Sequence, residues 1–112
     1  MRRSTDFTAV VRSGRRAPSP TLVVHMLSRD DSEPARVGLI VSKGVGGSVI
    51  RHQVARRLRA VCAERLSDFR SGDLVVLRAL PEAARASSEQ LASDLEQAIG
   101  RLARRAAATE VS

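Results

Sequence analysis

The sequence predicts one domain of the α+β class, because helical and strand patterns follow one another irregularly and without repeats. Two apolar, β-branched segments in the first half indicate strands, and a third lies between two long amphipathic stretches with helical spacing. A chain of 112 residues can bury one modest core, so we expect residues 1–112 to form a single domain.

The chain is expected to open with a short helix. Phe7, Val10 and Val11 recur at i, i+3 and i+4, so they share one face of a helix over residues 4–13. Gly14 then ends this helix, since glycine readily adopts the conformations that close one.

Strands are expected to follow this helix. Residues 21–27 (TLVVHML) and 36–42 (RVGLIVS) are rich in β-branched side chains and predict two strands. The acidic segment 30–34 is expected to turn between them, and residues 15–18 are a candidate for a short additional strand.

The second half predicts a long helix, a strand and a final helix. The long helix runs from about Ser48 to Phe69, and residues 74–80 (LVVLRAL) are almost wholly apolar up to Pro81, which is typical of a central strand. Ser87 and Gln90 form a capping-box pattern at the start of the last helix. The apolar face of that helix contains Leu91, Leu95, Ile99 and Leu102.

The charge pattern indicates a nucleic-acid partner. The net charge is +7 and the isoelectric point is about 11.5, a basic balance typical of nucleic-acid binding. Seven cations stand against one carboxylate between residues 36 and 65. Because the chain has no Tyr or Trp to stack on bases, backbone contacts are expected to dominate.

The long helix divides into a packing face and a cationic face. At about 100° per residue, His52, Arg56 and Arg59 fall together, where guanidinium forks could bind phosphate. His52 could be a solvent-facing imidazole or an RNA contact. Arg51 and Arg57 point away from this face, and for them a solvated helix surface is as good an interpretation as direct RNA contact. The packing face contains Val54, Leu58, Val61 and Cys62, and Leu66 is expected to pack beside Cys62.

No catalytic or metal site is expected. The glycines at 44, 46 and 47 precede Ser48 rather than the lysine of a nucleotide-binding loop, so they indicate a tight turn near phosphate. His25 and His52 lack metal-ligand spacing, and the carboxylates are scattered. Cys62 is alone, and no membrane span or secretory signal is evident, so the cytoplasm is the expected location.

Three segments resemble the protein component of bacterial ribonuclease P. RRSTDFTAVVRSGRR is similar to the first helix and loop of that family, RVGLIVSK to its strand before the basic helix, and VIRHQVARRLR to its arginine-rich segment. Val11 stands where a second aromatic is frequent. Four helix positions also depart from the pattern: His52 replaces Asn, Gln53 replaces Arg, Ala55 replaces Lys and Ala60 replaces Glu.

The resemblance implies an αβββαβα two-layer sandwich with a left-handed crossover through the basic helix. It implies the protein subunit of an endoribonuclease whose RNA subunit requires Mg²⁺ and removes 5′ leaders from precursor tRNA. No cofactor is expected to be bound firmly by the protein itself. The residues expected to bind the catalytic RNA are Lys43, Arg51, His52, Arg56, Arg57 and Arg59. The residues expected to line the leader cleft are Phe7, Val11, Val23 and His25.

Two alternatives remain open at this point. A helix-turn-helix DNA-binding protein would use the basic helix in a major groove, although that motif needs a preceding helix and a tight turn. A ribosomal protein would share the small size and the basic charge.

Overall fold

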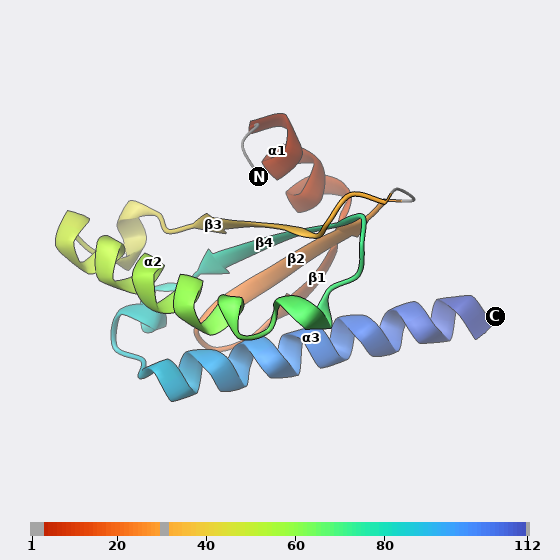
Figure 1. Cartoon of the computed structure of the whole chain (residues 1–112). Coiled ribbons are helices and arrows are strands. Elements are labelled where there is room, and N and C mark those ends of the chain that lie inside the picture. Colours follow the sequence, from red (N-terminus) through yellow and green to blue (C-terminus); the bar gives the residue numbers. More distant parts are fainter. Residues whose placement is uncertain (1–3, 30–31, 112) are drawn as a thin grey trace.

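The computed structural model describes residues 4–29 and 32–111, and its elements follow the predicted order (Figure 1). The helices and strands are α1 (Ser4–Ser13), β1 (Arg15–Pro18), β2 (Leu22–Ser28), β3 (Arg36–Ile40), α2 (Ser48–Ala63), β4 (Asp73–Ala79) and α3 (Ser88–Val111). The short helical turns are η1 (Lys43–Val45), η2 (Leu66–Asp68) and η3 (Pro81–Ala84). The strand expected at 15–18 is confirmed as β1, whereas Asp30 and Asp31 of the acidic turn lie outside the described residues.

The strands form one sheet in the order β1, β2, β4, β3. β2 pairs antiparallel with both β1 and β4, whereas β3 runs parallel to β4 and is joined to it by a crossover through α2. This crossover has the left-handed sense that the resemblance implies (Figure 1). Because β4 lies inside the sheet, its residues from Asp73 to Leu77 are all buried, as predicted for a central strand.

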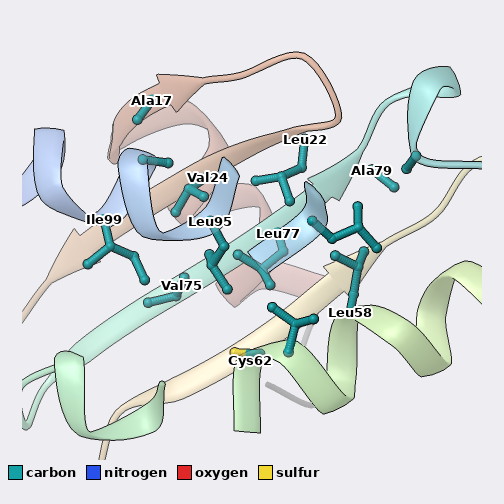
Figure 2. Packing of buried hydrophobic residues seen from close by; sticks show 14 of the residues in the cluster. Ala17, Leu22, Val24, Leu58, Cys62, Val75, Leu77, Ala79, Leu95 and Ile99 are labelled. Atoms are coloured by element: carbon teal, nitrogen blue, oxygen red, sulfur yellow. The ribbon is translucent and has the colours of Figure 1, made fainter. Parts of the chain in front are cut away.

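The main core lies between the sheet and the layer of α2 and α3. Leu22 and Val24 of β2 and Leu77 of β4 point into this layer, where they meet Leu58 of α2 and Leu95 of α3 (Figure 2). All five side chains are fully buried. This packing fixes which side of α2 is turned away from solvent.

A smaller cluster joins α1 to the opposite face of the sheet. Val10 is fully buried against Val76, and Phe7 packs at the edge of the same cluster. A Cβ atom at Gly14 would lie 2.4 Å from the Val10 carbonyl oxygen and 2.7 Å from that of Met26. The predicted helix stop at Gly14 is therefore confirmed, and close packing excludes any side chain there.

The long helix ends earlier than the pattern predicts. α2 stops at Ala63 rather than Phe69, because the Arg65 amide donates to the Cys62 carbonyl oxygen and the chain then turns through η2. This turn buries Phe69 and leaves Leu66 51% exposed. The predicted packing of Leu66 beside Cys62 is therefore wrong. Cys62 is itself buried as expected, and burial raises the pKa of its thiol.

The cap of α3 forms only half of the predicted capping box. The Gln90 amide donates to Ser87 Oγ at 3.1 Å, which is the expected cap. The Gln90 side chain does not return to the cap but donates to Asp94 Oδ1 at 2.9 Å. Asp94 thereby enters a buried network that joins α3 to β2.

Candidate nucleic-acid interface

The predicted division of α2 into two faces is confirmed by burial. Val54, Leu58, Val61 and Cys62 are buried, as the helical spacing indicates. His52, Arg56 and Arg59 are exposed on the other side, and we call these three residues the basic face. α2 therefore holds two guanidinium groups and an imidazole in a row along a helix that the core keeps in place.

The arginines of the basic face are not neutralised by any carboxylate in the described part of the chain. Within the described residues, Arg56 and Arg59 form no ion pair. Arg65, just beyond the end of α2, provides the contrast, because its Nη2 lies 2.5 Å from Glu96 Oε1 of α3 and this bond raises the pKa of Arg65. Arg65 thus ties two helices together, whereas the basic face remains available to an external anion.

The other predicted RNA-binding residues lie on different surfaces. Lys43 is exposed in η1, before the start of α2. Arg51 is half-buried, and its Nε atom has no hydrogen-bond partner among the described residues. Arg57 is exposed beside the start of α3, where Nη1 donates to the Ala86 carbonyl oxygen at 3.4 Å. The structure therefore joins only His52, Arg56 and Arg59 into one face.

A groove beside the basic face was not predicted from the sequence. It lies between α2 and the start of α3 and has a volume of about 390 Å³. Its lining residues are Gln53, Arg56, Arg57, Ala60 and Ser88. The helical spacing could have grouped the α2 residues, but nothing in the sequence indicates that Ser88 lies opposite them.

The four residues expected in a leader cleft belong to α1 and to the sheet face that α1 covers. Phe7 is half-buried and Val11 is 38% exposed, so both present surface to solvent. Val23 and His25 lie two residues apart on the same face of β2, and each is 4% exposed. The sheet register puts His25 opposite Val76, to whose cluster Phe7 also belongs.

His25 lies between two cations that the sequence did not identify as its neighbours. The register pairs His25 with Arg16 of β1, while Arg78 is opposite Val23 on β4. Burial lowers the pKa of His25, and the charges of Arg16 and Arg78 lower it further. Neither ring nitrogen has a hydrogen-bond partner in the described part of the chain. The neutral imidazole therefore keeps both hydrogen-bonding positions unused.

Acidification is expected to destabilise the fold through His25. Because its pKa is lowered from 6.5 in the folded state, the unfolded chain binds more protons as the pH falls below that value. Stability present above pH 6.5 is thus lost as the pH falls toward the folded pKa. Urea denaturation at about pH 7.5 and about pH 5.5 should show a smaller loss in His25→Leu than in the wild type. Equal losses would assign the effect to other groups.

The described residues form no cluster that could act as a metal-dependent active site. No three of their His, Cys, Asp or Glu side chains cluster as metal ligands. No described helix is long and apolar enough to cross a membrane. The helix-turn-helix alternative finds no support, because α2 follows β3 and η1 rather than another helix.

Comparison with known proteins identifies close sequence relatives. A family model described as Ribonuclease P matches residues 1–103. The chain is 49% identical over 110 residues to the ribonuclease P protein component of Streptomyces bikiniensis, with 91% of this chain and 89% of the relative covered. It is 48% identical over 106 residues to that of Beutenbergia cavernae, with 95% and 89% covered.

Solved structures share the fold at lower sequence identity. The RNase P protein of Staphylococcus aureus superposes with a TM-score of 0.79 at 21% identity, covering 89% of this chain and 91% of the other. The RNase P protein of Thermotoga maritima, solved with 1-(4-fluorophenyl)-2-thiourea, gives 0.79 at 17% identity, covering 90% and 97%. The arrangement of four strands and three helices is therefore shared.

Proposed function

Because the chain belongs to the ribonuclease P protein family and is the protein subunit of that endoribonuclease, we propose that it joins the catalytic RNA to precursor tRNA. The catalytic RNA would bind the basic face, while the 5′ leader of the precursor would lie along the sheet face beside α1. The protein is thus an RNA-binding component of tRNA processing that positions substrate, and the bond is broken by the RNA subunit.

The observation that carries this proposal is that Arg56 and Arg59 of α2 form no ion pair with any of the described residues. A guanidinium fork that lacks an intramolecular carboxylate can donate two hydrogen bonds to phosphate oxygens and cannot lose its charge. Arg56 and Arg59 meet this condition among the described residues. His52 on the same face adds a ring N–H that can donate a hydrogen bond to an RNA backbone.

The sheet face beside α1 has the composition that a single strand of RNA needs. Phe7 offers a ring on which a base can stack, a contact worth about 1 to 3 kcal/mol. The ring nitrogens of His25 are buried and would meet RNA only after a local rearrangement, whereas Arg16 and Arg78 already place positive charge on this face. These groups support leader binding next to Val11 and Val23, the other two residues of the expected cleft.

Mg²⁺ in this proposal is bound by the RNA subunit, and the protein holds no cofactor of its own. The Mg²⁺ ions would stabilise the charge that develops during hydrolysis of the phosphodiester. We place this function in the bacterial cytoplasm, where precursor tRNA is made.

Reconstitution tests the proposal directly. We expect the protein, added to a bacterial ribonuclease P RNA at low Mg²⁺ concentration, to restore cleavage of precursor tRNA. Phe7→Ala should reduce the preference of the holoenzyme for precursor over mature tRNA by roughly 5- to 150-fold, which corresponds to the stacking of one base. The preference is measured as the ratio of the two dissociation constants.

The matched control is Phe69→Ala, which removes a buried phenyl ring from the other side of the sheet. The fraction of Phe69→Ala protein that folds should keep the wild-type preference for precursor over mature tRNA. If the wild type leaves low-Mg²⁺ cleavage unchanged while a relative's subunit restores it, the joining role is wrong. If Phe7→Ala and the wild type show equal preference, the leader does not bind beside α1.

A further inference from the structure

We infer that His25 links the selection of precursor tRNA to pH, because leader binding on the sheet face beside α1 is coupled to protonation of its buried imidazole. The coupling rests on the proposed leader site and adds to it a proton that the protein takes up when the leader binds. It passes through the charges of Arg16 and Arg78, so it needs no contact between the imidazole and RNA. His25 is therefore a positioning residue that acts through these two arginines.

The sheet register places cations on both sides of His25, on the face that α1 covers (Figure 1). Residues directly opposite each other on antiparallel strands have their side chains on the same face, so Arg16 of β1 lies beside His25. On β4, Arg78 is opposite Val23, which is two residues from His25 and therefore on that face as well. Diagonal neighbours of this kind are about 7 to 8 Å apart, which an arginine side chain can span.

The two arginines can be reached by RNA, whereas the imidazole cannot. Arg16 and Arg78 are exposed, while His25 is 4% exposed and its ring nitrogens have no partner in the described part of the chain. A leader strand on this face would therefore meet the guanidinium groups first. Its phosphates would bring negative charge close to a group that they do not touch.

Other charged residues on the elements packed against His25 have less influence on it. They are Asp6, Arg12, Arg15 and Asp73. Arg15 donates to the Leu102 carbonyl oxygen of α3, on the other side of the sheet, and Asp73 accepts a hydrogen bond from Ser28 at the start of β4. Arg12 is exposed on α1. Among the described residues, Arg16 and Arg78 are thus the charges that act on the imidazole.

Leader binding should reverse part of the effect that keeps the imidazole neutral. Burial lowers the pKa of His25 most, and the charges of Arg16 and Arg78 lower it further. A phosphate that pairs with either arginine cancels part of this repulsion. The leader adds little desolvation, because only 4% of His25 is exposed before the leader binds. The pKa of His25 should therefore rise in the complex.

A rise in this pKa means that the complex binds more protons than the free protein does. The affinity for the leader should accordingly increase as the pH falls from the pKa of the bound state toward the lower pKa of the free state. A rise of one pKa unit corresponds to a gain in affinity of at most about tenfold. Mature tRNA lacks the 5′ leader, so its binding provides the reference without this gain.

The test compares the preference of the holoenzyme for precursor over mature tRNA at about pH 7.5 and about pH 5.5. We expect the wild-type preference to be roughly 3- to 10-fold greater at the lower pH. His25→Leu is neutral at both pH values and should remove this rise. Arg16→Gln combined with Arg78→Gln should remove it as well, because phosphate is then no longer drawn to this position. Circular dichroism at both pH values checks that each protein is folded.

His52→Leu is the matched control, because His52 is the other histidine of the chain and is exposed on α2. Any loss of affinity for the catalytic RNA in this variant acts on both tRNAs and cancels in the ratio, so the rise should remain. If Phe7→Ala lowers the preference but the wild-type preference is equal at both pH values, the proton linkage fails and the leader site stands. If neither Phe7→Ala nor pH changes the preference, both fail. A rise that persists in His25→Leu or in the double arginine variant would overturn the linkage through His25.

Discussion

Replacing both Arg56 and Arg59 with alanine is expected to weaken binding to the catalytic RNA by on the order of 100-fold at low salt. Each guanidinium is exposed and unpaired among the described residues, so each can neutralise one phosphate and release its counterions. The slope of log K against log salt should fall by about 0.7 to 0.9 for each lost contact. Filter binding of the protein to ribonuclease P RNA over a salt series measures both quantities.

The control removes the same amount of charge from other elements of the molecule. Arg12 of α1 and Arg36 of β3 are exposed, and neither belongs to α2. The double variant Arg12→Ala and Arg36→Ala lowers the net charge equally and should keep most of the slope. An unchanged slope in the Arg56 and Arg59 variant would remove the basic face from the interface. Equal losses in both variants would show that binding follows net charge without a defined face.

The faces of α2 could be predicted because they depend on local spacing alone. A helix turns by a fixed angle per residue, so Leu58 and Arg59 must lie on different sides wherever the helix is placed. The end of the helix was not predictable in this way. The spacing continued through Leu66, but the chain turns through η2 and buries Phe69 in the main core, which helical spacing alone does not indicate.

The surroundings of His25 and of the groove depend on contacts between distant segments. Arg16 and Arg78 lie beside His25 because of the pairing of three strands, and no spacing within one strand indicates that register. Ser88 reaches the groove because α3 packs against α2. The residues of a continuous helix face could therefore be predicted, whereas those of a site built from several elements could not.

A second set of long-range contacts holds α3 to the sheet and was also absent from the sequence prediction. Asp94 is 3% exposed, and its Oδ2 accepts hydrogen bonds from the Thr21 amide at 3.1 Å and the Thr21 hydroxyl at 2.5 Å. Its Oδ1 accepts a third bond from Gln90. Thr21 is buried as well, so these donors have no access to solvent. The network fixes α3 at the point where β2 begins.

Asp94→Ala is accordingly expected to lower the free energy of unfolding by about 2 to 4 kcal/mol. The change leaves the amide and hydroxyl of Thr21 buried without their acceptor, and that penalty exceeds the value of an average hydrogen bond. Asp94→Asn should lose less stability, because its amide oxygen can still accept from Thr21.

Urea denaturation of the wild type, Asp94→Ala and Asp94→Asn measures these losses, with Asp68→Ala as the control because Asp68 is exposed. A loss in Asp94→Ala no greater than in Asp68→Ala would show that the network does not hold α3 on the sheet.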